Sequence, residues 1–375
     1  MKLQELLVYL EERIDPEHQS RAEQLHIDAM DFKPVSHLPI SIVYPRDERI
    51  VPFTYTDSVM DMEKMMFNEL AGLSTNVLNA VEIKDEYPLQ IRANYGIGVI
   101  CSLFGLESVI KYDNMPWITP LDSIDDLRLI VDHGMPKLDA ALGQKVRQCC
   151  EFYRETLARY ENCSRWIHIT QPDLQGPFDI LHLMLGNELF YALYDESELV
   201  HDALKLISET YIAYHQYITP YTTGLIDEGR KCVVHYAIYG GKLVIKDDTA
   251  MATLSGDVYN EFVVPYNTMV MRALSTSNGR EGSVHFCGVR KAWHYPQMLK
   301  QPLNCLNFGN PEMHDFEEHC GLLQAECISV VGYGQGNDYE IVQKLKDSGV
   351  NTGITLLINT DSRETAKCIL KMHQR

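Results

Sequence analysis

The chain has 375 residues, of which 45% are hydrophobic and 23% charged, and its formal net charge is -19 at pH 7. This apolar fraction excludes a disordered chain, while the negative charge argues against binding to nucleic acid or to an anionic membrane surface. Ten cysteines without regular spacing do not indicate a disulfide framework, so we expect a protein of a reducing compartment, the cytoplasm.

The start of the chain does not have the pattern of a signal peptide. Lys2 and Glu5 carry charges where a signal peptide requires an unbroken apolar segment. No apolar run approaches the roughly 18 residues of a membrane span. We therefore expect a soluble protein with no membrane partner.

Residues 3–30 place apolar side chains at helical spacing among charges, which predicts amphipathic helices. We treat residues 1–35 as an N-terminal helical extension and about 36–375 as the rest of one domain. Further helices are expected at 57–72, from Asp122 or Ser123, at 139–161, from Asp195 to about Tyr217, and from Gly256 with a break at Pro265.

Short apolar segments that predict strands alternate with these helices, most regularly in the last third of the chain. The strand candidates are residues 38–44, 95–106, 166–170, 243–245, 282–287, 303–308, 328–332 and 353–358. A helix at 339–347 is expected after the strand at 328–332, and another is expected from Asp361, after the strand at 353–358. About eight strands alternating with helices after a helical start predict an α/β fold, a (β/α)₈ barrel with extra N-terminal helices.

Polar side chains stand at the carboxyl ends of several predicted strands, where barrel enzymes place their active sites. From this placement we expect Asp173, Asp248 and His285 to be catalytic. The expected binding residues for a small-molecule substrate are Tyr44, Arg49, Gln171, Asp247, Asn307 and Gln335.

The segment from Gly282 to Gly288 contains the clearest candidate for a metal site. Val284 and Phe286 alternate with His285 and Cys287, so the imidazole and the thiol share one face of a predicted strand. Together they are half of a zinc site. His-x-Cys alone is a weak signal, because both residue types are common in protein cores.

Several segments in a fixed order resemble the superfamily of uroporphyrinogen decarboxylase and the cobalamin-dependent methyltransferases that share its barrel. They are Pro172–Phe178, Tyr194–Val200, Asp248–Ser255, Glu261–Phe262, Pro265–Tyr266 and His285–Gly288. The likeness runs from about Leu38 to the C-terminus and implies the barrel fold.

The resemblance to the decarboxylase itself is interrupted at the positions that would bind its substrate. Arg49 matches one arginine of the family's N-terminal motif, but Arg46 is out of register. Gly96 stands where the family has an aspartate, and Leu183 where it has a tyrosine. A tetrapyrrole with many carboxylates would bind poorly without these groups.

The methyltransferase branch implies a zinc ion held by His285, Cys287 and a distant cysteine. No cysteine stands near Leu357 to Asp361, where the third ligand is expected, and Cys305, Cys327 and Cys368 lie elsewhere. Either Asp361, Asp247 or Asp248 completes the site, or the protein holds no catalytic zinc.

The leading hypothesis is an enzyme of one-carbon metabolism that moves a methyl group between a corrinoid, free or on a partner protein, and a small acceptor. The alternatives are a decarboxylase acting on another substrate and a non-catalytic module that binds a corrinoid or tetrapyrrole. The sequence leaves open whether zinc is bound and whether the protein forms a homodimer.

Overall fold

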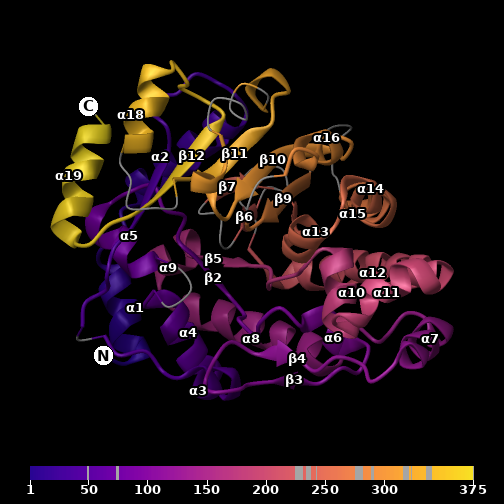
Figure 1. The fold of residues 1–375 in the computed structure, drawn as a ribbon. Coiled ribbons are helices and arrows are strands. Elements are labelled where there is room, and N and C mark those ends of the chain that lie inside the picture. Colours follow the sequence, from indigo (N-terminus) through magenta and orange to yellow (C-terminus); the bar gives the residue numbers. More distant parts are fainter. Residues whose placement is uncertain are drawn as a thin grey trace.

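The fold is organised around a six-stranded parallel sheet with the strand order β1-β12-β11-β10-β9-β8 (Figure 1). The computed structural model describes residues 1–374 except 49, 73–75, 224–230, 234–237, 242, 275–281, 289–290, 316–320, 322 and 335–339. The strands of this sheet are β1 (Ile40–Val43), β8 (Leu243–Lys246), β9 (Gly282–Phe286), β10 (Leu303–Phe308), β11 (Ser329–Tyr333) and β12 (Ile354–Asn359).

Three smaller sheets accompany the main one. A parallel pair joins β2 (Gln90–Arg92) to β5 (His168–Thr170). The two antiparallel pairs are β3 (Ser108–Val109) with β4 (Trp117–Ile118) and β6 (Lys231–Val233) with β7 (Ile238–Gly241).

Helices precede the sheets and fill most intervals between the strands, as the alternating pattern predicted. Those before β5 are α1 (Leu3–Glu11), α2 (Pro16–Met30), α3 (Tyr55–Met60), α4 (Met62–Leu70), α5 (Val77–Ile83), α6 (Val99–Leu103), α7 (Ile124–His133), α8 (Ala141–Leu157) and α9 (Glu161–Trp166). Those after β5 are α10 (Pro177–Leu185), α11 (Glu188–Asp195), α12 (Ser197–Ile218), η1 (Thr219–Tyr221), α13 (Asp248–Thr253), α14 (Gly256–Phe262), α15 (Val264–Leu274), α16 (His294–Met298), η2 (Pro311–Met313), α18 (Glu340–Asp347) and α19 (Arg363–His373). No helix in the described part of the chain is long and apolar enough to cross a lipid bilayer.

Local signals in the sequence account for several helix boundaries. Ser123 caps α7 by accepting a hydrogen bond from the Asp126 amide, and Asp126 bonds back to Ser123 in a capping box. The helix expected to break at Pro265 is two helices, α14 and α15, separated at Val263. The last helix was expected to begin after Asp361, and the structure caps it one residue later, at Ser362, which accepts a hydrogen bond from the Thr365 amide.

The free edge of β1 is satisfied by acidic side chains instead of a neighbouring strand. Glu86 accepts a hydrogen bond from the Ile40 amide at 3.1 Å, and Asp85 accepts one from the Ile42 amide at 2.6 Å. The Glu86 amide also donates to the Ile40 carbonyl at 3.0 Å. These contacts occupy the groups that a paired strand would otherwise use.

The opposite edge, at β8, is bridged in a similar way, since the Gly176 amide donates to the Lys246 carbonyl at 2.8 Å. Gly176 must be small here, because a Cβ atom at this position would lie 2.8 Å from that carbonyl oxygen. The structure confirms an α/β fold with a parallel sheet, but a closed ladder of eight strands is not formed among the described residues.

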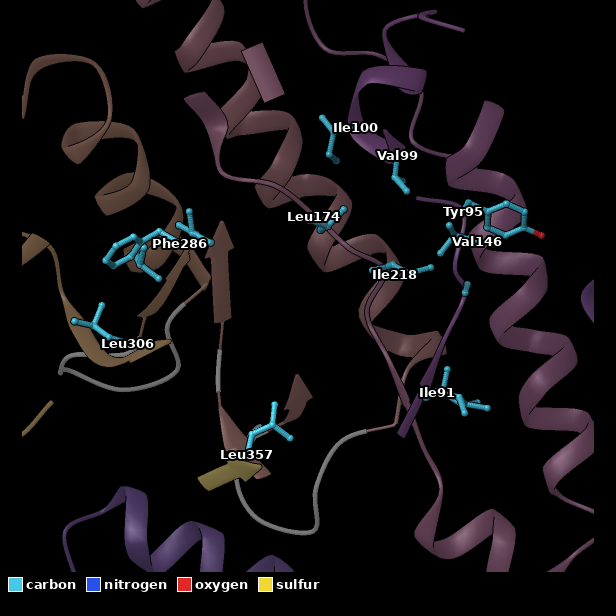
Figure 2. Packing of buried hydrophobic residues seen from close by; sticks show 14 of the residues in the cluster. Ile91, Tyr95, Val99, Ile100, Val146, Leu174, Ile218, Phe286, Leu306 and Leu357 are labelled. Atoms are coloured by element: carbon cyan, nitrogen blue, oxygen red, sulfur yellow. The ribbon is translucent and has the colours of Figure 1, made fainter. Parts of the chain in front are cut away.

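Apolar side chains from both parallel sheets contribute to the core. Figure 2 shows Ile91, Val146 and Ile218 on the right of the view, and Phe286 and Leu306 from the six-stranded sheet on the left. All five are among the buried residues of one hydrophobic cluster.

One strand was predicted in the wrong place. Residues 95–106 were expected to form the second strand, but they contain α6 and loops, and the strand is β2 at Gln90–Arg92. β2 is only three residues long and two of its side chains are polar, so it lacks the apolar alternation that marks a strand in sequence.

Candidate metal site at the carboxyl edge of the sheet

The candidate site is built from two rows of side chains that cross β8, β9 and β10. In the first row Lys246 pairs in register with His285, and His285 pairs with Asn307. Residues in register on parallel strands project to the same face, so these three side chains are lateral neighbours.

The second row lies two residues further along, beyond the ends of the strands. Asp248 is the first residue of α13, and its Oδ1 accepts a hydrogen bond of 2.8 Å from the Cys287 amide. Gly309 follows β10 beside Cys287, and its amide donates to the Phe286 carbonyl at 2.8 Å. The turn from β8 into α13 therefore brings Asp248 next to the His285-x-Cys287 pair.

Asp248, His285 and Cys287 each present one potential ligand atom, and these atoms all lie within 4.8 Å of one another. His285 Nε2 is 3.3 Å from Cys287 Sγ and 3.5 Å from Asp248 Oδ1. The His285 side chain is only 11% exposed, whereas the Asp248 side chain is 38% exposed and Cys287 is also exposed. The cluster is thus closed behind the imidazole and open on the side of the carboxylate and the thiol.

The electrostatics of the cluster disfavour two neighbouring anions. Burial and the Asp248 carboxylate raise the pKa of the Cys287 thiol to about 11. Burial also lowers the pKa of His285. The Asp248 carboxylate opposes this decrease, and the positive charge of Lys246 reinforces it. His285 and Cys287 are therefore uncharged at neutral pH in the metal-free protein, and a bound cation would favour the thiolate form of Cys287.

Asn307, which we expected to bind substrate, is wholly buried behind His285. Its amide contacts His285 Nδ1 at 2.5 Å and the Val331 carbonyl at 2.5 Å. Both ends of the amide are thus in contact with protein groups.

Asp173 lies in a buried ionic network beside the cluster. Its carboxylate is 2.5 Å from Lys246 Nζ and 3.1 Å from an Arg92 guanidinium nitrogen, and Gln175 also donates to it. Burial lowers the pKa of Lys246, and the attraction of Asp173 opposes that effect. The network connects the end of β2, the segment after β5 and the end of β8.

Asp247 faces away from the metal-ligand cluster. Its carboxylate accepts hydrogen bonds from the Tyr259 hydroxyl at 2.7 Å and from the Asn267 amide at 2.8 Å. Burial raises the pKa of this wholly buried group to about 7, and the two hydrogen bonds oppose the rise.

Asp179 on α10 holds the start of α13 in place. Its carboxylate accepts hydrogen bonds from the amides of Thr249 and Ala250, at 2.8 Å and 3.1 Å. These bonds fix the backbone directly after Asp248 and so help to define where that side chain points. Burial, reinforced by the Asp247 carboxylate, raises the pKa of Asp179 well above its usual range.

Tyr44 lies at the carboxyl end of β1, the same edge of the sheet that carries the cluster. It lines an open cavity of about 610 Å³ together with Arg46, Asn76 and Asn79, and none of the three clustered residues lines this cavity. The Tyr44 hydroxyl donates to the Asn79 carbonyl at 3.1 Å.

Of the three remaining predicted binding residues, only Gln171 is described by the structure, and it lies outside the cluster. The Gln171 side chain donates to the Thr219 hydroxyl at 3.3 Å. Arg49 and Gln335 lie outside the described residues.

The other candidates for a third ligand lie elsewhere. Asp361 accepts a hydrogen bond from the Thr365 hydroxyl at the start of α19, and Cys305 is buried within β10. Cys327 and Cys368 are exposed but do not belong to the cluster. Of the alternatives that the sequence left open, Asp248 is the one that lies beside His285 and Cys287.

Arg92, Lys246 and Asp179 were not singled out from the sequence. Lys246 could have been found from the sequence, because a lysine rarely stands at the end of an apolar strand directly before two aspartates. Arg92 was missed together with β2. Asp179 has no local signal, since it occupies the first turn of a helix, where an acidic residue is ordinary.

Comparison with known proteins adds a relation at the level of the fold. No protein-family model matches the chain, and no curated protein matches it. Among solved structures, a methyltransferase from Methanosarcina mazei has a similar fold, with a TM-score of 0.59 and 14% sequence identity, over 94% of this chain and 98% of that chain. At this identity the likeness concerns the fold alone.

Proposed function

We propose that the chain is a corrinoid-linked methyltransferase that moves a methyl group to a small thiol acceptor at a zinc site formed by Asp248, His285 and Cys287. The observation that carries the proposal is the convergence of these three side chains at the carboxyl edge of the sheet, with potential ligand atoms within 4.8 Å of one another. The shared fold with a methyltransferase agrees with it.

The donor set is suited to zinc. Imidazole, thiolate and carboxylate all bind this metal, and three protein ligands with one open position are usual in catalytic sites. The open side of the cluster, beside Asp248 and Cys287, is where an acceptor would approach. A carboxylate in place of a second thiolate makes the set harder and less selective for soft metals.

The protein's residues would have distinct tasks. His285 would hold the metal from β9 and Cys287 from the residue that follows β9, and Asp248 would complete the set from the start of α13. When bound, zinc would lower the pKa of the acceptor thiol, so that a thiolate exists at neutral pH. A methylated corrinoid substrate would supply the methyl group to the acceptor sulfur and keep the electron pair of its cobalt–carbon bond, and the thiol proton would leave to solvent.

Elemental analysis of protein purified without added metal tests the site. We expect stoichiometric zinc in the native chain and its loss in Cys287→Ser, His285→Ala and Asp248→Asn. Cys327→Ser is the matched control, because Cys327 is exposed but lies outside the cluster. Retention of full metal content in the first two variants would show that the pair is not a ligand set.

The reaction is tested with methylcobalamin as donor and a small thiol as acceptor. We expect demethylation of the corrinoid by the native chain and none by the metal-free variants. A second arm offers a carboxylated tetrapyrrole, whose turnover would instead support a decarboxylase. Corrinoid binding without either reaction would support the non-catalytic module.

A further inference from the structure

Asn307 connects His285 to the neighbouring strand β11. The side chain is wholly buried and lies beside His285 in the register of β9 and β10. One end of its amide is 2.5 Å from His285 Nδ1, and the other is 2.5 Å from the Val331 carbonyl.

The chemistry of these partners decides the orientation of the amide. The Val331 carbonyl can only accept, so the Asn307 NH₂ group must face it and the Asn307 oxygen must face His285. That oxygen can only accept as well. A hydrogen on His285 Nδ1 therefore makes this contact a hydrogen bond, whereas a lone pair on Nδ1 would face the lone pairs of the oxygen.

A β-bulge explains why the Val331 carbonyl is presented to Asn307. The pairing of β11 with β12 shifts in register between Val330 and Tyr333. Gly332, inside the shift, has a φ of 63°, in the left-handed region that favours glycine, and its amide donates to the Thr355 hydroxyl at 3.0 Å. Bulges are over-represented next to active sites, where they disrupt the local ladder and re-aim side chains.

From this arrangement we infer that the β11 bulge, acting through Asn307, holds His285 in the tautomer with hydrogen on Nδ1 and directs the Nε2 lone pair toward Asp248 and Cys287. Asn307 is thus a positioning residue for the ligand atom of His285. That the Nε2 lone pair serves as a metal ligand rests on the proposed function. The tautomer itself does not, because it is a property of the metal-free protein.

The direct test is the ¹⁵N spectrum of the histidine side chains in metal-free protein, with His285 assigned by its absence in His285→Gln. Two-bond correlations distinguish the tautomers, and we expect His285 to carry hydrogen on Nδ1. In Asn307→Leu the new side chain is close in volume but has no acceptor for Nδ1, so His285 should shift toward a mixture of the two tautomers. Asn307→Asp, which keeps an acceptor, should restore hydrogen at Nδ1.

Zinc binding gives a second readout, measured against a competing chelator. Outer partners of histidine ligands typically change metal affinity by about 10- to 100-fold, and we expect a loss of that size in Asn307→Leu with partial rescue in Asn307→Asp. Asn304→Leu is the control, because it removes an asparagine side chain from the same strand at a position that does not pair with His285.

Native His285 with hydrogen on Nε2 would overturn the inference, as would an unchanged tautomer in Asn307→Leu. If Asn307→Leu does not fold, the tautomers of the native chain and Asn307→Asp still decide the matter. Failure of the proposed function would be seen separately, as absence of zinc or of methyl transfer alongside the expected tautomer.

Discussion

Gly309 shows how one residue without a side chain makes room for a functional group. A Cβ atom at this position would lie 2.3 Å from Cys287 Sγ and 3.2 Å from the Cys287 Cα atom. The space beside β9 is therefore taken by the thiol, and any other residue at 309 would have to displace it. The clash is with a rotatable side chain, so its main consequence falls on the site and not on the fold.

We expect Gly309→Ala to move the Cys287 thiol out of the cluster. The affinity for zinc should fall at least about tenfold, while the free energy of unfolding should change by about 1 kcal/mol or less, because the thiol can rotate away. Chelator competition and urea unfolding measure the two effects. Gly321→Ala, where a Cβ would meet no atom within 4 Å, is the control. Unchanged zinc affinity in Gly309→Ala would contradict the packing argument.

At the scale of elements, the ionic network of Asp173 connects the paired strands β2 and β5 to β8 of the six-stranded sheet. Arg92 ends β2, Asp173 follows β5, and Lys246 ends β8. The side chains of Arg92 and Asp173 are 1% and 5% exposed, and that of Lys246 is 11% exposed. Loss of one partner from a buried network is costly because the remaining charges have already given up their hydration.

Asp173→Asn should therefore destabilise the protein by about 3–5 kcal/mol, as measured by urea unfolding. Combining Asp173→Leu with Lys246→Met removes one charge of each sign and should recover part of that loss. Glu196→Gln at the exposed pair with Arg128 is the control and should cost less than about 1 kcal/mol. An equally small effect of Asp173→Asn would show that the network does not hold the strands together.

At the scale of the whole molecule, both ends of the chain are anchored beside the free edge of β1. His26 on α2 contacts the Glu86 carbonyl through Nε2 at 2.8 Å, and His373 on α19 contacts the Leu38 carbonyl at 2.7 Å. Glu86 itself caps the Ile40 amide of β1. The N-terminal helices and the last helix thus share one site of attachment to the sheet.

His26 makes the stability of this assembly depend on pH. Burial lowers its pKa from 6.5 to about 4, so between these values the unfolded chain binds a proton that the folded chain does not. The free energy of unfolding should therefore fall as the pH is lowered from 6.5 to 4, by about 3 kcal/mol from this group alone.

Urea unfolding at several pH values measures this dependence. His26→Gln should flatten the curve between pH 6.5 and 4, and His133→Gln, at an exposed position on α7, is the control substitution. Parallel curves for the native chain and His26→Gln would mean that other groups cause the acid sensitivity.

The sequence alone was sufficient for features that depend on local periodicity. Residues 303–308 form β10 with the expected boundaries, and His285 in β9 and Cys287 just after it lie close together, as the alternation predicted. Caps and periodicity likewise located α7, α12, α18 and α19 to within a few residues, whereas α5, α10 and α11 were not predicted. These features are readable because neighbours along one strand or helix determine them.

Tertiary structure decided what lies across from each of these elements. Asp247, Asp248 and Asp361 were equivalent candidates in sequence, and only the pairing of β8 with β9 and the turn into α13 bring Asp248 to the cluster. The buried role of Asn307 depends on a bulge in another strand, and β2 is held by Arg92 and its distant partners. Periodicity states which face a side chain occupies, but the partner on that face comes from a remote part of the chain.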